Sequence, residues 1–195
     1  MRPTGQIIGE VNVKHCSGRY MDEFIRLKCT PDLLLMGVFP NAKEITESMA
    51  AFRATQRYIS RFDMRDPSVT VYCVGDGCTP RTGALFAYRT AWSVISIDPA
   101  LKDKGKWAGI ERLSCVREKV EDIGKFGISK KALIVAVHSH ADLTEAYRKL
   151  CSEDTAIIAL PCCVPQKLFE IEPDYDFQDF GIWSPKRRVL IWENV

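Results

Sequence analysis

The sequence of 195 residues lacks the features that mark several large classes of protein. It contains no run of about 18 consecutive apolar residues, so we expect no membrane-spanning helix. Its 27 basic and 25 acidic residues leave a net charge of +2, which is too small for a general attraction to nucleic acid or to a membrane surface. With 46% hydrophobic and 27% charged residues and no internal repeat, the composition is that of one globular domain.

The eight cysteines lack the spacing of a zinc site and the setting of a disulfide framework. No Cys-x-x-Cys pair occurs, and the adjacent Cys162 and Cys163 are poorly placed to bind one zinc ion together. The first residues have neither the apolar core nor the cleavage site of a signal peptide. We therefore expect no bound metal, and free thiols in a reducing intracellular compartment, the cytoplasm or nucleus. Cys73 and Cys115 are expected to be buried in strands.

We expect residues 1–40 to form a short β-rich N-terminal extension, because their pattern is that of short strands. Residues 5–14 alternate weakly between apolar and polar side chains. Residues 24–28 and 33–38 are two further extended candidates, and the turn signal Thr30-Pro31-Asp32 separates them.

Residues 41–195 predict a single α/β domain. Asn41 followed by Glu44 is a helix-capping pattern before a helix over residues 42–62. Strands are then expected at residues 69–74, 92–97, 113–117, 133–137 and 156–160, helices at about 82–90 and 143–150, and a C-terminal antiparallel strand pair at 180–183 and 189–192. This order predicts a three-layer sandwich around a mainly parallel sheet.

In such a sheet, ligands bind beyond the carboxyl ends of the strands, beside the first strand. There, Gly75 and Gly77 allow positive φ and a close approach of backbone to ligand, and Thr79 can cap the helix that Pro80 opens. Asp98, at the end of the second strand, is placed to accept hydrogen bonds from both hydroxyls of a ribose. The residues expected to contact the ligand are Val74, Gly75, Asp76, Gly77, Thr79, Arg81, Asp98 and Pro99.

Dinucleotides and S-adenosylmethionine are the two ligand families that use this plan, and the spacing argues against the first. A Gly-x-Gly-x-x-Gly match needs glycine where the chain has Pro80, and no Walker lysine follows. The loop, with Asp98 downstream, resembles motifs I and II of the class I S-adenosylmethionine-dependent methyltransferases. The resemblance covers residues 67–195 and implies S-adenosylmethionine as the cofactor. The chain departs from the commonest glycine-rich pattern, because residues 78–82 contain no glycine.

A segment after the fourth strand resembles Leu-His-x-Cys-Gly-Asp-Leu, a motif of a methyltransferase subgroup with RNA-modifying members. His138, Asp142 and Leu143 match it, while His140 stands in place of the cysteine and Ala141 in place of the glycine. A histidine can take a proton from an N–H or O–H nucleophile, so His138 and His140 are the candidate catalytic residues. The alternatives are hydrogen bonding within the fold for either histidine, and helix capping for Asp142.

Cys162 and Cys163, after the fifth strand, match the adjacent cysteines of the same subgroup and are expected on the substrate side of the cleft. Together with Cys78 they predict a thiol-rich rim at the ligand edge of the sheet. The resulting hypothesis is a methyltransferase with RNA as a candidate acceptor. The alternative is a binding or assembly module with the same fold and no catalytic activity.

Three charged segments are candidate partner surfaces. Arginines recurring every four residues on the first long helix could contact RNA, as could a lysine-rich segment next to Trp107. Residues 170–179 carry five acids and no base, so they form either a loop over the pocket or a protein-binding site. Solvated surface is the alternative for the basic segments, whose residues are Arg53, Arg57 and Arg61, and Lys102, Lys104 and Lys106.

Overall fold

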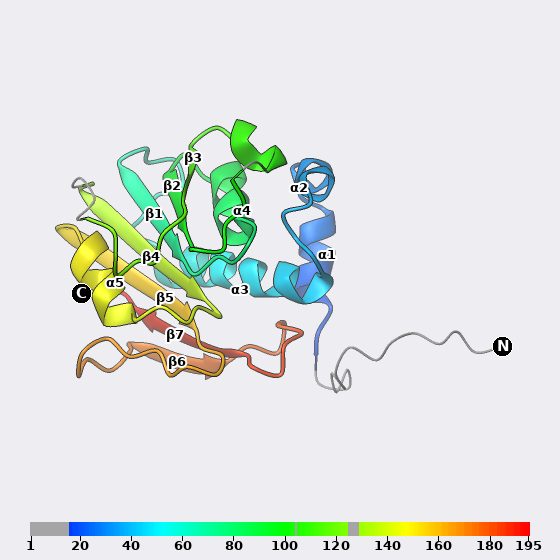
Figure 1. Ribbon diagram of the computed structural model, residues 1–195. Coiled ribbons are helices and arrows are strands. Elements are labelled where there is room, and N and C mark those ends of the chain that lie inside the picture. Colours follow the sequence, from blue (N-terminus) through cyan, green and yellow to red (C-terminus); the bar gives the residue numbers. More distant parts are fainter. Residues whose placement is uncertain (1–15, 104, 125–128) are drawn as a thin grey trace.

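The computed structural model describes residues 16–103, 105–124 and 129–195. Within these ranges seven strands form one sheet in the order β3-β2-β1-β4-β5-β7-β6 (Figure 1). Neighbouring strands are parallel except at β7, which is antiparallel to both β5 and β6. The strands are β1 (Val69–Val74), β2 (Ser93–Ile97), β3 (Leu113–Val116), β4 (Lys131–Val137), β5 (Asp154–Leu160), β6 (Tyr175–Gln178) and β7 (Arg188–Trp192).

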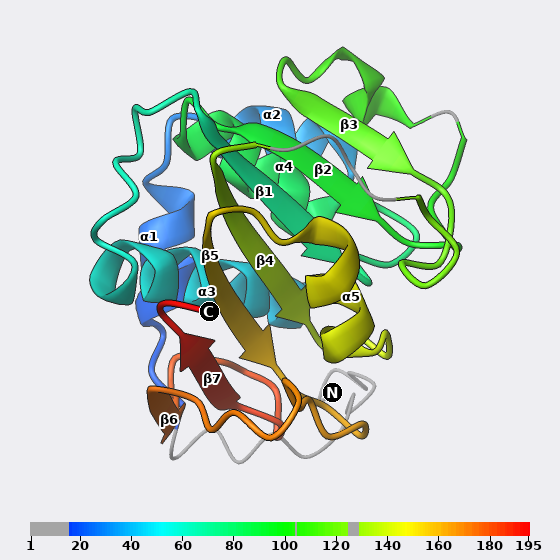
Figure 2. The same cartoon turned by 90° about the vertical axis from the view of Figure 1, so that its left-hand side faces the viewer.

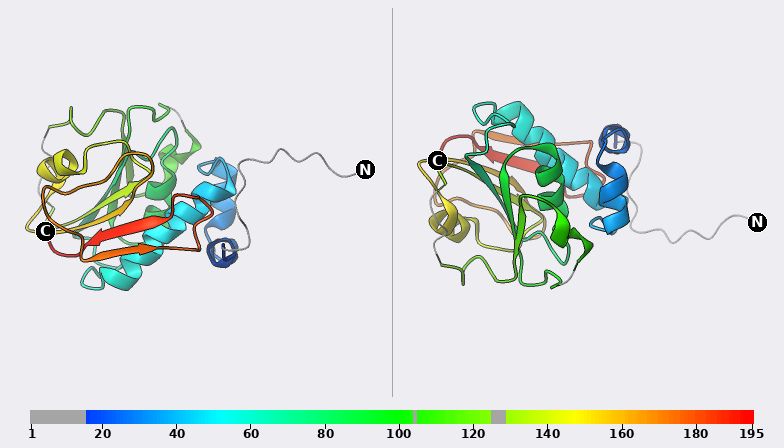
Figure 3. Two further views of the ribbon diagram at one scale, coloured as in Figure 1. Left: turned by 90° about the horizontal axis from the view of Figure 1, so that it is seen from below. Right: turned by 90° about the horizontal axis from the view of Figure 1, so that it is seen from above.

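Helices cover both faces of the sheet, which confirms the predicted three-layer α/β architecture. α3 and α4 pack on one face, and α5 packs on the other (Figures 2 and 3). The helices are α1 (Arg19–Ile25), α2 (Thr30–Met36), α3 (Ala42–Tyr58), α4 (Arg81–Arg89) and α5 (Leu143–Leu150), with a short 3₁₀ turn, η2 (Lys106–Gly109). Asn41 caps α3 as predicted, since its side chain accepts a hydrogen bond from the Glu44 amide at 3.1 Å.

The two faces of β1 show why the fold needs both helical layers. Alternate residues of a strand point to opposite faces. Val71 and Cys73 therefore join the core under α3 and α4, while Tyr72 and Val74 join the core under α5. Continuous apolar strands of this kind are stable only where both faces are covered.

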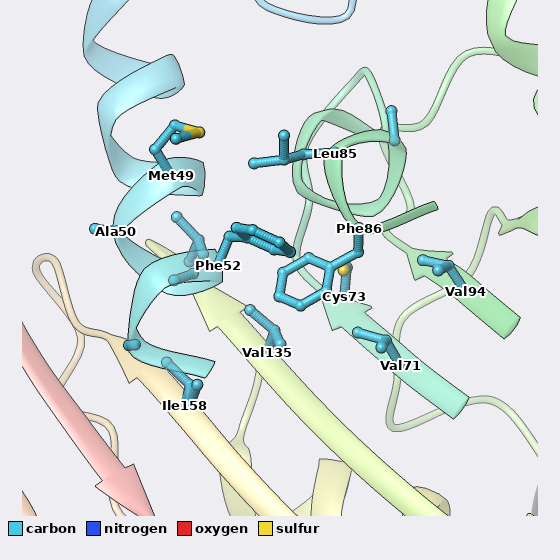
Figure 4. Packing of buried hydrophobic residues seen from close by; sticks show 14 of the residues in the cluster. Met49, Ala50, Phe52, Val71, Cys73, Leu85, Phe86, Val94, Val135 and Ile158 are labelled. Carbon is cyan, nitrogen blue, oxygen red and sulfur yellow. The ribbon is translucent and has the colours of Figure 1, made fainter. Parts of the chain in front are cut away.

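The larger of the two cores packs aromatic rings among aliphatic side chains, and Figure 4 shows Phe52 and Phe86 facing each other there. The rings of Phe52 from α3 and Phe86 from α4 meet edge to face, with centroids 5.3 Å apart. Phe86 also stacks on Trp92 at 6.2 Å, just before β2. These contacts fix α3 and α4 to each other and to the sheet.

The N-terminal region corrects the prediction of a β-rich extension. Neither segment expected as a strand is one: residues 24–28 form the end of α1 and the turn after it, and residues 33–36 belong to α2. Residues 5–14 lie outside the described ranges. Tyr20 and Phe24 lie one helical turn apart and are both buried, so the pattern is that of a helix with a single buried face. Pro31 stands in the first turn of α2, where its missing N–H costs nothing.

A buried carboxylate fixes α1 to the end of the sheet. The Tyr20 hydroxyl donates to Asp179 Oδ2 at 2.5 Å, and Arg19 forms an ion pair with the same carboxylate. Burial, together with the neighbouring Asp179, raises the pKa of Tyr20 well above its ordinary value. The hydroxyl therefore remains a hydrogen-bond donor throughout the neutral pH range.

Two further expectations need correction. The first strand of the C-terminal pair lies at β6, not at residues 180–183, because Asp179 closes the hairpin earlier and accepts from the Gly181 amide. Cys115 is exposed instead of buried, because β3 is an edge strand that lacks a neighbour on one side. Of the helices in the described ranges, none combines the length and the apolar composition that crossing a membrane requires.

Phe52→Ala tests the aromatic core. Phe52 is 2% exposed, and its truncation should lower the free energy of unfolding by about 3–5 kcal/mol, since it removes buried area and leaves a cavity. The matched control is Phe180→Ala, because Phe180 is 53% exposed and should cost less than about 1 kcal/mol. Urea unfolding of both variants measures the difference, and equal losses would contradict this assignment of the core.

Candidate functional site

A cleft of about 670 Å³ lies at the carboxyl ends of β1, β2 and β4. The chain passes from β1 to β2 on one side and later to β4 on the other, so this is the switch point of the sheet. The predicted ligand residues that line the cleft are Val74, Gly75, Gly77, Arg81, Asp98 and Pro99, and both His138 and His140 line it as well.

The two glycines of the loop after β1 adopt conformations that other residues rarely take. Gly75 has φ +71° and Gly77 has φ +84°. A Cβ atom on Gly75 would lie 2.2 Å from Ser139 Oγ, and one on Gly77 would lie 2.4 Å from Arg81 Nη1. Gly75 therefore allows the loops after β1 and β4 to pass against each other at the floor of the cleft.

Asp76 and Thr79 are not brought to the cleft wall. The buried Asp76 carboxylate accepts hydrogen bonds from the Thr82 and Gly83 amides, both at 3.0 Å, and from Ser96 Oγ at 2.8 Å. Asp76, and not Thr79, thus caps the start of α4. Burial raises the pKa of Asp76, although Arg81 and the amide donors oppose that shift. The Thr79 hydroxyl donates instead to the Val38 carbonyl at 2.6 Å.

Asp98 keeps its carboxylate at the cleft by bonding to two backbone amides. Oδ2 accepts from Gly77 N at 2.8 Å, and Oδ1 accepts from Ala100 N at 2.7 Å. Each oxygen retains a lone pair, because a carboxylate offers about four acceptor positions. The arrangement can therefore take two further donors from a bound molecule, which is what a ribose diol presents.

Sequence analysis missed the loop after β3. Three of its residues, Lys119, Glu121 and Asp122, line the cleft. Glu121 Oε1 accepts from the Asp142 amide at 3.1 Å and so joins this loop to the start of α5. The sequence could have indicated this loop only by its position, since every loop that follows a parallel strand reaches the carboxyl edge of the sheet.

His138 is held between acceptors on both sides of its ring. Its φ is +50°, an uncommon conformation for a residue other than glycine. Nδ1 lies 3.4 Å from Glu47 Oε1, and Nε2 lies 3.2 Å from the Lys186 carbonyl oxygen. Burial lowers the pKa of His138, and the neighbouring Glu47 opposes that shift.

Glu47 is the second group that sequence analysis missed. It is fully buried near the start of α3, where Oε1 accepts from Lys43 Nζ at 2.9 Å. Its Oε2 atom has no hydrogen-bond partner among the residues that the structure describes. One turn earlier, Glu44 faces Arg81 at 3.4 Å. A buried carboxylate with a free oxygen is costly, so its place beside His138 makes Glu47 a candidate for a role at this end of the cleft.

His140 meets the two adjacent cysteines at the rim. Cys163 Sγ lies 3.2 Å from His140 Nε2 and 3.5 Å from Cys162 Sγ. Burial opposes ionisation of Cys162, but the amides of Cys163 and Val164 and its neighbours Cys163 and His140 hold its pKa below the ordinary value. All eight cysteines lie within the described ranges and are free, as predicted.

Asp142 takes the capping role that sequence analysis left open. Its side chain accepts from the Glu145 amide at 3.0 Å at the start of α5.

None of the described residues of the predicted partner surfaces lines the cleft, and Lys104 lies outside the described ranges. Part of the charge on these surfaces is neutralised within the chain. Arg53 pairs with Glu23 at 2.6 Å, and Arg61 pairs with Asp154 at 2.9 Å. Arg57 stacks over Tyr58. The acidic stretch 170–179 is not a loop over the pocket, because β6 occupies much of it at the far edge of the sheet from β3.

Comparison with known proteins identifies the fold. No protein-family model matches the chain, and no curated protein sequence matches it significantly. Among solved structures, a glutamate-to-glutamine point variant of MtNAS, a nicotianamine synthase, aligns with 89% of this chain and 68% of its own length, at 15% identity and a TM-score of 0.53. MtNAS in complex with MTA and tNA aligns with 89% of this chain and 68% of its own length, at 12% identity and a TM-score of 0.53.

A third solved structure, the plantazolicin methyltransferase BpumL in complex with SAH, aligns with 77% of this chain and 60% of its own length, at 14% identity and a TM-score of 0.45. The MtNAS likenesses and the strand order show a class I S-adenosylmethionine-dependent methyltransferase-like fold, as the sequence resemblance implies.

Gly75→Ala tests the close passage of the two loops. Gly37 offers a matched control, since its φ is +66° and a Cβ there would meet nothing within 4 Å. Gly37→Ala should cost about 1 kcal/mol of unfolding free energy from backbone strain alone. Gly75→Ala should cost about 1–3 kcal/mol more, because Ser139 must move as well. Chemical denaturation of both variants gives the comparison, and equal costs would show that Ser139 does not constrain the loop.

Proposed function

We propose that this chain is an S-adenosylmethionine-dependent methyltransferase that uses the cleft at the switch point of the sheet. The observation that carries the proposal is the combination of Gly75, Gly77 and Asp98 at one edge. The glycines bring backbone to the floor of the cleft, and Asp98 presents a fixed carboxylate with free acceptor positions. This pairing suits a nucleoside with a free ribose diol.

The residues present fit S-adenosylmethionine. The cleft volume of about 670 Å³ is in the range of small-molecule sites, and the loop that contains Gly75 and Gly77 lines it with backbone. Asp98 would hold the ribose, the Gly75–Gly77 backbone and Arg81 would face the amino-acid end, and the loop bearing Asp122 would lie against the base. When bound, S-adenosylmethionine supplies a methyl group on a positively charged sulfur, which is open to attack by a nucleophile.

For the proton of the acceptor we propose a role for His138 supported by Glu47. His138 lines the cleft, and Glu47 contacts its ring from the buried side. Burial favours the neutral imidazole, which is the form that can accept a proton. With Nδ1 facing Glu47, the proton would go to Nε2, which would first have to leave the Lys186 carbonyl for the bound acceptor. The Glu47 carboxylate would then favour the charged ring. His140 remains the second predicted candidate, at the thiol rim.

RNA stays a prediction for the acceptor. Arg53 and Arg61, two of the three arginines predicted to contact it, are paired within the chain, and no described residue of either basic segment lines the cleft. A base at His138 suits an acceptor whose nucleophile loses a proton on methylation, and RNA, proteins and small molecules can all offer such a group. The turnover experiment therefore compares RNA, protein and small-molecule fractions.

Binding of S-adenosylmethionine is measured by calorimetry and thermal shift, with S-adenosylhomocysteine and NAD as comparison ligands. At 100 times its dissociation constant, a ligand stabilises the fold by about 2.7 kcal/mol. Asp98→Asn should weaken S-adenosylmethionine binding roughly 10–100-fold, because it removes a charged acceptor of the ribose. Asp103→Asn, at a carboxylate that is 69% exposed and outside the cleft, is the matched control and should bind as the wild type does. No shift with either adenosyl ligand would sink the proposal.

Turnover is tested by transfer of a labelled methyl group to fractionated RNA, protein and small molecules. With the labelled fraction as acceptor, His138→Gln and Glu47→Gln should each lower kcat about 10²–10⁴-fold while leaving the dissociation constant of S-adenosylmethionine unchanged. An unchanged kcat in both variants would remove the proposed proton transfer. Binding without transfer to any fraction would instead favour the non-catalytic binding module.

A further inference from the structure

Three potential metal ligands converge beside the cleft, from two loops far apart in the sequence. His140 follows β4, and Cys162 and Cys163 follow β5. Their ligand atoms all lie within 4.8 Å of one another. Because β4 and β5 are parallel neighbours, their carboxyl ends meet at one edge of the sheet and bring these loops together.

We propose that His140, Cys162 and Cys163 bind a divalent cation of the zinc type, independently of any nucleoside in the cleft. Thiolate sulfur and imidazole nitrogen are the ligands that zinc prefers in proteins. Binding would release the two thiol protons, so the thiolates carry the charge that the cation neutralises.

The distances agree with this chemistry. A tetrahedral zinc ion, with bonds of about 2.3 Å to sulfur and about 2.0–2.1 Å to nitrogen, sets its ligand atoms about 3.5–3.8 Å apart. The observed separations are 3.5 Å between the two sulfurs and 3.2 Å between Cys163 Sγ and His140 Nε2. The third separation, between Cys162 Sγ and the His140 ring, lies within 4.8 Å, so side-chain shifts of at most about 1 Å would bring all three atoms to tetrahedral spacing.

The backbone explains how adjacent cysteines reach a single point. In a regular strand, neighbouring side chains point to opposite faces, and Cys162 and Cys163 would then diverge. Here β5 ends at Leu160, and both residues lie in a bend after Pro161. The bend turns their side chains to the same side, which the sequence rule of alternation does not allow for.

Hydrogen bonds fix the loop after β4 against the loop after β5. Gln166, 5% exposed, donates from Nε2 to the Ser139 carbonyl at 2.8 Å. The His138 amide donates to the Leu160 carbonyl at 2.9 Å. On one loop these bonds hold the two residues before His140, and on the other they hold residues before and after the two cysteines. Such supporting contacts keep metal ligands in place.

The site would leave one coordination position open. Three protein ligands with a free fourth position are typical of zinc sites that meet a small molecule, while closed structural sites use four. His140 belongs to both the cluster and the wall of the cleft, so the cation would lie at the cleft rim. A bound acceptor with a free thiol, amine or hydroxyl is the kind of molecule that could reach it.

Cobalt serves as the spectroscopic probe, in metal-free protein kept reduced with a phosphine. Co²⁺ should bind at one ion per chain and give the near-ultraviolet absorption of cobalt–thiolate bonds, and Zn²⁺ should abolish that absorption. The double variant Cys162→Ser with Cys163→Ser should lose it, and His140→Asn should bind Co²⁺ about tenfold more weakly or worse. The control is Cys78→Ser with Cys151→Ser, which alters two exposed thiols outside the cluster and should keep the full signal. Absence of the absorption in the wild type, or its survival in the Cys162 and Cys163 variant, would overturn the site.

Alkylation of the wild-type chain gives a second test that needs no variant. Zn²⁺ should slow the reaction of Cys162 and Cys163 with iodoacetamide, while the exposed Cys151 reacts at an unchanged rate in the same sample. Mass spectrometry of peptides separates the two groups of thiols. Equal rates with and without Zn²⁺ at Cys162 and Cys163 would contradict the proposal, whether or not S-adenosylmethionine binds.

Discussion

The buried carboxylate of Asp76 is the interaction on which the cleft depends. It joins the start of α4 to β2, because the Thr82 and Gly83 amides and the Ser96 hydroxyl all donate to it. A carboxylate of this kind is stable in a protein interior only when its acceptor positions are used. With α4 and β2 fixed in this way, the loop between β1 and α4 has little freedom, and Gly75 and Gly77 take the positive φ values that the short path requires.

The opposite end of the cleft, at His138 and Glu47, contains a polar group without a partner in the described ranges. Glu47 is buried with one oxygen that lacks a partner within the described ranges, next to a histidine in an uncommon backbone conformation. Both features reduce the stability of the fold, and such costs are concentrated where a protein binds or reacts. The ribose end of the cleft is thus held by satisfied hydrogen bonds, whereas the end at His138 retains unused polar groups. This difference supports our placement of the acceptor chemistry at the second end.

The central parallel strands were predictable because burial on both faces imposes one type of sequence pattern, whereas the edge strand β6 lies at Tyr175–Gln178 and not at the expected residues 180–183. β1 and α5 begin and end where the sequence predicts, and the order of strands and helices follows from the alternation of their patterns. The N-terminal helices were mistaken for strands because each spans only two turns, so too few residues reveal a helical period. In addition, α2 leaves Leu34 and Leu35 exposed, which obscures its buried face. The burial of Cys115 was wrongly predicted because strand sequences do not reveal which strand lies at an edge.

Local sequence patterns are enough to place the candidate site residues at one edge of the sheet: a glycine-containing loop after the first strand, Asp98 after the second, and the histidine and cysteine segments after the fourth and fifth. They suffice because parallel strands bring their carboxyl ends to one side. Which of these side chains face the cleft depends on the packing of the whole chain. That packing turned Asp76 inward, set Glu47 behind His138 and brought Cys162 and Cys163 to the same point as His140. The direction of a side chain in a loop depends on contacts with segments distant in the chain, and local periodicity carries no information about those contacts.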